Sequence, residues 1–213
     1  SIGGNTFAMP DPFLVLATQN PIENEGVYPL PEAQRDRFLF KILIEYPSVE
    51  EEREIIYRMG VTPPSAREVL SPAELTRLQG VASRVFVHHA LVDYVVRLVA
   101  ATRAPDEHGL ADVAGWISFG ASPRASLGII AGARALALVR GRDYVLPQDV
   151  VDVVPDVLRH RLVLSYDALA DGVPLEHLIS RVLQTVPLPQ VAARTSGPPM
   201  GQAMSGVGAP GRP

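Results

Sequence analysis

The chain has 213 residues, of which 47% are hydrophobic and 20% are charged, and its formal net charge is −4. This composition suffices for a buried core and excludes a disordered or collagen-like polymer. Nineteen basic against 23 acidic side chains leave no basic excess, so no nucleic-acid partner is expected. The absence of cysteine excludes disulfides, thiolate zinc sites and cysteine nucleophiles, and we expect a cytoplasmic location.

Two further features limit the kinds of site that the chain can hold. It begins with Ser1 and no signal-peptide pattern follows, so the sequence is interpreted as a piece of a longer reading frame. Its only lysine, Lys41, lies in an apolar segment, so no G-x-x-x-x-G-K-[ST] phosphate loop occurs. The longest apolar stretch, 127–139, is interrupted by Arg134 and is shorter than the ~20 residues of a membrane helix, so no membrane insertion is expected.

Residues 1–60 show an α/β pattern. Two continuously apolar runs, 13–17 and 38–44, have the form of strands buried on both faces of a sheet. A capping box, Ser48-x-x-Glu51, then begins a helix. The elements expected in chain order are a strand at 1–8, a strand at 13–17, a polar loop at 18–31, a helical turn at 32–37, a strand at 38–44 and a helix at 48–60.

From residue 61 onward the sequence has the period of helices. A proline-bearing linker, 61–70, precedes a second capping box, Ser71-Pro72-Ala73-Glu74. We expect part of an α/β domain at 1–60, an all-α domain at 71–186 and a disordered tail at 187–213, where prolines and glycines accumulate. Within the all-α domain, helices are expected at 71–84, 88–103, 123–140, 147–160 and 174–185.

Asn20 lies just beyond the first buried run, at the strand end where open α/β sheets bind ligands. The following Pro21 restricts Asn20 to an extended backbone. An amide held there can accept a hydrogen bond from a water and donate one to a phosphate oxygen, which suits the positioning of a nucleophile. The alternative from the local sequence is that Asn20 caps a turn.

Two arginines, Arg35 and Arg37, precede the second buried run. Residues two apart on a helix face different ways, so only one can point along a given interface, and Arg37 adjoins the apolar Phe38. A rigidly based guanidinium can stabilise a phosphoryl-transfer transition state. The alternative is a solvated arginine that pairs with Glu32 or Asp36.

Arg124 falls in the first turn of a predicted helix, because Ser122 is a good N-cap and Pro123 suits the first helical position. A cation there opposes the helix dipole by about 0.3–1 kcal/mol unless an anion lies between them. Free backbone N–H groups and an arginine together favour phosphate binding. The alternative is an exposed arginine without a role.

Other features have simpler interpretations. His88 and His89 begin a helix on which adjacent side chains diverge by ~100°, so a surface or capping role is expected rather than a metal pair. Trp116 and Phe119 are expected in the helical core rather than against an adenine ring. No metal-ligating residues are assigned.

Three strings identify a family. The chain resembles the C-terminal part of MoxR-type ATPases of the AAA+ class in ATQNPIENEGVYPLPEAQRDRF within residues 13–40, in GASPRAS at 120–126 and in HRLVLSYDALADG at 160–172. The resemblance implies a partial AAA+ core of the P-loop NTPase type, followed by a helical lid. It also implies that the phosphate loop and the acidic Mg²⁺-binding strand end lie upstream of Ser1, so this piece alone is not expected to hydrolyse ATP.

The resemblance also implies roles for the polar residues. Asn20 matches the sensor 1 asparagine, which orients the attacking water. Arg37 matches the arginine finger, offered across a ring interface to the ATP of the neighbouring subunit, and Arg124 matches the sensor 2 arginine, which reaches nucleotide held by its own subunit. Arg35 stands where the family usually has an aliphatic residue, so it either supplements Arg37 or makes the finger assignment ambiguous.

For the intact protein, the resemblance implies an ATPase in a homo-oligomeric ring, expected to be a hexamer, with ATP and Mg²⁺ as cofactors. It implies chaperone-like assembly or activation of protein complexes, together with a partner that carries a von Willebrand factor A domain. The competing interpretation is a non-enzymatic interaction module that binds partners without nucleotide. A helicase or replication factor is disfavoured because the chain has no basic groove.

Overall fold

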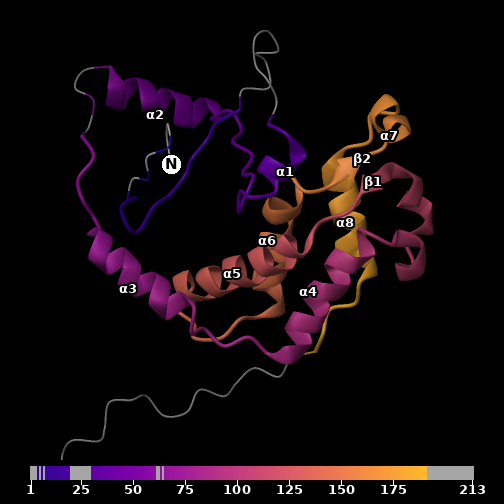
Figure 1. Cartoon of the computed structure of the whole chain (residues 1–213). Helices are drawn as coiled ribbons and strands as arrows, with labels where there is room; N and C mark the ends of the chain where they lie inside the picture. Colours follow the sequence, from indigo (N-terminus) through magenta and orange to yellow (C-terminus); the bar gives the residue numbers. More distant parts are fainter. Residues whose placement is uncertain are drawn as a thin grey trace, which may run out of the picture.

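The computed structural model describes residues 4, 6, 8–19, 30–60, 63 and 65–190, and the structural statements below concern these residues. No helix among them is long and apolar enough to cross a membrane. Figure 1 shows the elements, which are α1 (Glu32–Arg35), α2 (Val49–Met59), α3 (Pro72–Ala82), α4 (His89–Ala101), the 3₁₀ helices η1 (Pro105–His108) and η2 (Ala111–Trp116), β1 (Ile117–Phe119), α5 (Pro123–Val139), α6 (Pro147–Leu158), β2 (Val163–Leu164), α7 (Tyr166–Ala170) and α8 (Leu175–Thr185).

Helices α4, α5, α6 and α8 enclose the hydrophobic core, whereas α2 lies apart from them (Figure 1). The five long helices predicted beyond residue 70 are confirmed, each to within a few residues at its ends. Helix α5 turns a stripe of small buried residues toward α6, which allows close approach of the two axes. The stripe includes Gly128, which faces Val157, and Gly132, which faces Val153.

Side chains at the helix starts explain where these helices begin. Both predicted capping boxes are confirmed: the hydroxyls of Ser48 and Ser71 accept hydrogen bonds from backbone N–H groups three residues ahead, and the glutamates at those positions accept in return. His88 is the N-cap of α4, where its Nδ1 accepts from the Ala90 N–H at 3.2 Å. The capping role predicted for this histidine is confirmed.

A small antiparallel sheet was not anticipated from the sequence. Strand β1 pairs with β2, with Ile117 opposite Leu164, and these strands are too short to show an alternating pattern. Trp116, just before β1, packs against the core as expected. The expectation for Phe119 is wrong, because this residue, the last of β1, is 66% exposed.

The two buried strands predicted at 13–17 and 38–44 are absent from the described residues. Their apolar side chains are largely exposed, up to 92% at Ile44. A strand needs hydrogen-bonding neighbours, and the described residues supply none for either run. The start of the second run instead docks on the helical bundle, where the Lys41 N–H donates to the Asp156 carbonyl at 2.8 Å.

Several expectations concern residues outside the described ranges. Most of the strand at 1–8 and of the loop at 18–31 falls there, and so does the tail from 191 onward. The helical turn at 32–37 is confirmed as the short helix α1 and the turn after it. The division into domains at 61–70 stays a prediction.

Candidate functional site

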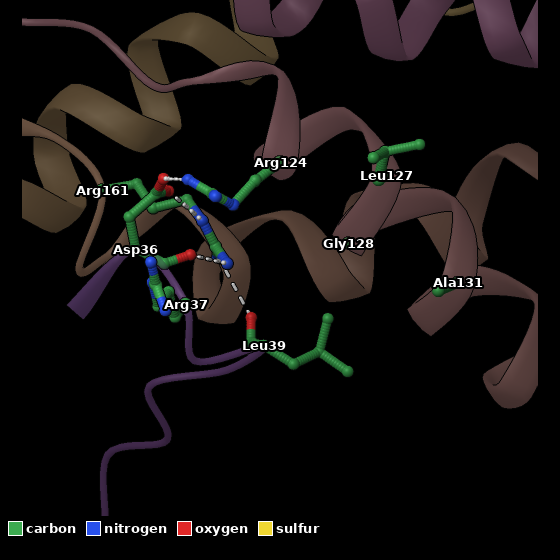
Figure 2. Close-up of a pocket in the computed structure, with 8 residues that line it drawn as sticks. All are labelled: Asp36, Arg37, Leu39, Arg124, Leu127, Gly128, Ala131 and Arg161. Atoms are coloured by element: carbon green, nitrogen blue, oxygen red, sulfur yellow. Dashed lines mark hydrogen bonds and ion pairs between the residues drawn. The ribbon is translucent and has the colours of Figure 1, made fainter. Parts of the chain in front are cut away.

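A shallow open pocket of about 280 Å³ lies between the turn that follows α1 and the N-terminal half of α5 (Figure 2). It is lined by Asp36, Arg37, Leu39, Arg124, Leu127, Gly128, Ala131 and Arg161. Three guanidinium groups and one carboxylate give this lining a formal charge of +2. Such a surface favours an anionic ligand, and guanidinium groups suit phosphate oxygens in particular.

Asp36 lies at the centre of the polar network beside the pocket, between arginines from two different segments (Figure 2). Its carboxylate accepts from Arg124 Nη1 at 3.0 Å and from Arg161 Nε at 3.0 Å. The Ser122 hydroxyl donates to both carboxylate oxygens, at 3.0 and 2.9 Å. One carboxylate thus connects the turn after α1 with the start of α5 and with the chain that follows α6.

Arg161 holds the backbone of that turn. Its side chain is only 3% exposed, and besides the Asp36 carboxylate it donates to the backbone carbonyls of Asp36, Phe38, Leu39 and Val157. All five of its N–H groups are used in these bonds. The adjacent His160 adds a bond from Nε2 to the Phe38 carbonyl at 2.9 Å. Arg37 therefore projects from a backbone that is fixed on both sides.

The electrostatics of the network follow from these contacts. Burial by itself would raise the pKa of Asp36, but hydrogen bonds from Arg124 and Ser122 and the charge of Arg161 hold it below its ordinary value. Asp36 is therefore ionised at neutral pH. Burial lowers the pKa of His160 and disfavours its cationic form, so the neutral ring donates to Phe38.

The predicted local geometry around Arg124 is confirmed. Ser122 is the N-cap of α5, its hydroxyl accepts from the Arg124 N–H at 3.2 Å, and Pro123 is the first helical residue. A cation in this turn needs a nearby anion, and the carboxylate of Asp36 supplies it from within the chain. The Arg124 side chain remains 59% exposed beside the pocket.

The loop before α5 is anchored by two residues at the end of α4. The buried Thr102 hydroxyl accepts from the Ala121 N–H at 3.0 Å, and Arg103 Nε donates to the Ala121 carbonyl at 2.7 Å. A Cβ atom at Gly120 would overlap the backbone of Thr102 and Arg103. The close approach of the two backbones therefore requires glycine at this position.

The two candidate finger arginines differ clearly in position. Arg37 is exposed and lines the pocket, and among the described residues its guanidinium has no hydrogen-bonding or ionic partner. Arg35 does not line the pocket, and its Nη2 lies 3.9 Å from Glu32 Oε1. The pairing with Glu32 considered from the sequence thus applies to Arg35 and not to Arg37.

The roles predicted for the site residues stay predictions. Asn20 lies outside the described residues. No group of three or more potential metal ligands occurs in the part of the chain that the structure describes. Sequence reasoning assigned no site role to Asp36 or Arg161. The available signal was the position of Arg161 beside the apolar run Leu162-Val163-Leu164, because a charge in such a setting is buried only when paired.

Comparison with protein families defines the class of the molecule. Residues 110–182 match the model of the AAA lid domain, and residues 1–40 match the model of the ATPase family associated with various cellular activities (AAA). The chain therefore combines part of an AAA core with the helical lid of that class, and the predicted fold class is confirmed. The network around Asp36 lies where the two matched segments meet.

Individual relatives narrow the class to a family. Chaperone MoxR1 of Mycobacterium tuberculosis is 74% identical over 193 residues, which cover 91% of this chain and 51% of the relative. YeaC of Bacillus subtilis is 35% identical, with coverage of 89% and 57%, and MoxR of Paracoccus denitrificans is 36% identical, with coverage of 82% and 56%. The chain belongs to the MoxR family of AAA+ proteins and corresponds to its C-terminal portion.

A solved structure agrees with this assignment. A crystal structure of a Cytophaga hutchinsonii protein described as a candidate ATPase superposes with a TM-score of 0.84 at 40% identity, and the match covers 89% of this chain and 58% of that one. The chain spans about half the length of the curated relatives it matches.

Proposed function

We propose that the full-length protein is an ATPase that acts as a homo-oligomeric ring, with a hexamer as the expected size, and drives chaperone-like assembly or activation of protein complexes in the cytoplasm. The observation that carries this proposal is the pocket of formal charge +2, which Arg37 and Arg124 both line at the junction of the two matched AAA segments. The name of the relative, Chaperone MoxR1, supports the chaperone-like role. A partner with a von Willebrand factor A domain remains part of the proposal.

The residues of the pocket fit a polyphosphate. Arg37 and Arg124 both have exposed guanidinium groups there, and such groups donate paired hydrogen bonds to phosphate oxygens. When bound, ATP supplies the phosphoanhydride bond that is hydrolysed, and Mg²⁺ neutralises its oxygens. We assign no described residue to Mg²⁺ and propose that its ligands and the phosphate loop belong to other parts of the full-length protein.

The roles proposed for the three polar residues follow the chemistry of phosphoryl transfer. Asn20 would orient the attacking water through its amide. Arg37 would stabilise the charge that develops on the transferred phosphoryl group, since it has a fixed backbone and an uncommitted guanidinium. Arg124 would bind a phosphate oxygen from the start of the lid helix α5.

Because Arg37 and Arg124 line the same pocket, their positions indicate whether they contact the same bound nucleotide. The family resemblance implies that Arg37 acts on the ATP of the neighbouring subunit and Arg124 on the ATP of its own subunit. Both side chains line one pocket, and Arg124 pairs with Asp36, the residue next to Arg37 in the chain. This arrangement favours action on the same nucleotide, so if Arg37 completes the neighbouring site, Arg124 does so too.

Substitution of Arg37 tests the proposed ATPase. In the full-length protein, Arg37→Ala should reduce the rate of ATP hydrolysis by about 10³-fold or more, the effect typical of an arginine finger, with ATP affinity changed much less. Steady-state hydrolysis and equilibrium binding of a fluorescent ATP analogue measure the two quantities. Arg35→Ala is the matched control and should retain most of the turnover, because Arg35 lies outside the pocket.

Two other outcomes would change the proposal, one in the residue that acts as the finger and one in the class of protein. Loss of turnover in Arg35→Ala with wild-type turnover in Arg37→Ala would move the finger role to Arg35. A full-length wild-type protein that binds no ATP would favour the non-enzymatic interaction module over the ATPase.

A further inference from the structure

Arg124 depends on a single side chain to balance its charge. Within the described part of the chain, the Arg124 guanidinium donates only to Asp36, at 3.0 Å, although more than half of the side chain is open to solvent. Its stem therefore has room to turn away from this partner. The bond can be exchanged, because the Arg124 end of the pair is open to water, and water competes for an exposed guanidinium.

Asp36, by contrast, does not depend on Arg124. If that arginine leaves, the carboxylate keeps the bond from Arg161 Nε and the two contacts with the Ser122 hydroxyl. Arg161 is nearly fully buried and is tied to four backbone carbonyls, so it cannot follow Arg124. The network therefore contains one mobile cation and one fixed cation on the same carboxylate.

From this asymmetry we infer that Asp36 is a positioning residue that occupies Arg124 in the absence of nucleotide, and that a nucleotide phosphate displaces it to bind Arg124. The carboxylate supplies the negative charge that the start of α5 requires until the phosphate replaces it. After the exchange, Asp36 stays with Arg161 and keeps the turn that bears Arg37 in place. This inference rests on the proposed function, since it describes how Asp36 controls the binding of nucleotide to Arg124 in the pocket of the proposed ATPase.

A double-mutant cycle in the full-length protein tests the exchange. The Kd for an ATP analogue is measured for the wild type, for Asp36→Asn, for Arg124→Ala and for the double variant. Asp36→Asn keeps an acceptor for Arg161 but removes the charge that competes for Arg124. It should tighten binding, and this gain should exceed the gain from the same change in the Arg124→Ala background by about two- to fivefold, the range of an exposed ion pair.

The second background separates exchange from other effects of the substitution. Removal of a carboxylate makes the pocket more positive in both backgrounds, and a purely structural role of Asp36 would also act in both. Equal changes in the two backgrounds would therefore overturn the inference while leaving the proposed ATPase intact. A wild-type protein that binds no ATP analogue would instead overturn the proposed function and this inference with it.

A structural measurement covers the case in which Asp36→Asn fails to fold. Crystal structures of the full-length wild type with and without a non-hydrolysable ATP analogue report the two contacts of Asp36 directly. With the analogue bound, Arg124 Nη1 should lie beyond ~4 Å from Asp36, outside ion-pair range, while Arg161 Nε stays in contact. An intact contact between Arg124 and Asp36 in the analogue-bound form would refute the exchange.

Discussion

At the scale of single residues, the position of Arg124 depends on a glycine four positions before it. Gly120 passes so close to the end of α4 that a Cβ atom would lie 2.8 Å from Arg103 Cα and would overlap the Thr102 carbonyl group. These are backbone atoms, so they cannot move aside as the end of a long side chain can. The next residue, Ala121, is tied to the same two residues by hydrogen bonds.

Gly120→Ala should therefore destabilise the full-length protein by about 1–3 kcal/mol, because the loop must move away from α4. Thermal unfolding followed by circular dichroism measures this loss. Gly115→Ala is the matched control, since a Cβ there meets nothing within 4 Å and the residue has no positive φ, and its midpoint should stay near the wild-type value. Equal midpoints for the two variants would show that the approach at Gly120 is not restrictive.

At the scale of elements, α5 and α6 illustrate why packing can outweigh helix propensity. Alanine is favoured over glycine in a helix interior by about 1 kcal/mol, yet α5 has glycine at 128 and 132. A Cβ at Gly132 would lie 2.7 Å from Val153 Cγ1 and 3.0 Å from Phe40 Cζ. Val153 is stiff in its helix, because two heavy atoms branch at its Cβ. Close helix packing therefore selects glycine here.

Two glycine substitutions in different helices should shift stability in opposite directions. Gly132→Ala should lower the free energy of unfolding by about 1 kcal/mol, since overpacking costs more than propensity returns. Gly80→Ala in α3 should raise it by about 0.4–1 kcal/mol, because the nearest atom to the new Cβ is Arg84 Nη1 at 3.9 Å. Denaturant titrations give both values, and a stabilising Gly132→Ala would contradict the packing account.

At the scale of the whole molecule, the segment 36–41 joins the AAA-core portion to the lid through hydrogen bonds to its backbone and through Leu39 and Phe40, whose side chains lie close to α5. The carbonyls of this segment accept from Arg159, His160 and Arg161, and the Lys41 N–H donates to α6. His160 is buried in this junction, and its Nδ1 has no partner among the described residues. The junction therefore includes an imidazole whose pKa is lowered by burial.

The pKa of His160 lies below its ordinary value of 6.5, so the unfolded chain binds a proton more readily than the folded one. The stability that the neutral ring contributes is present above about pH 6.5 and is lost as the pH falls through the lower folded pKa. His160→Gln should flatten the pH dependence of the unfolding free energy in this window, because glutamine can still donate to Phe38 without gaining a proton. Urea titrations of the wild type and the variant from pH 8 to pH 5 measure this dependence. If the unfolding free energy of the variant changes with pH as steeply as that of the wild type, His160 is not the source of the dependence.

The sequence by itself determined the features that depend on near neighbours. The capping boxes at Ser48 and Ser71, the N-cap at Ser122 and the long helices all follow from residues two to four positions apart, so the sequence of one chain suffices to predict them. The family was also evident, because the strings around Arg37 and Arg124 are specific. The predicted strands at 13–17 and 38–44 failed because strand formation requires a partner strand, which local sequence does not contain.

Only the tertiary structure decided which charges meet. Asp36 contacts Ser122, Arg124 and Arg161 across separations of 86, 88 and 125 residues, and no local rule selects these partners among 19 basic side chains. The same packing placed Arg37 in the pocket and paired Arg35 with Glu32. Local periodicity determines which face of a helix is apolar, whereas the burial of one arginine and the exposure of another depend on how distant elements pack together.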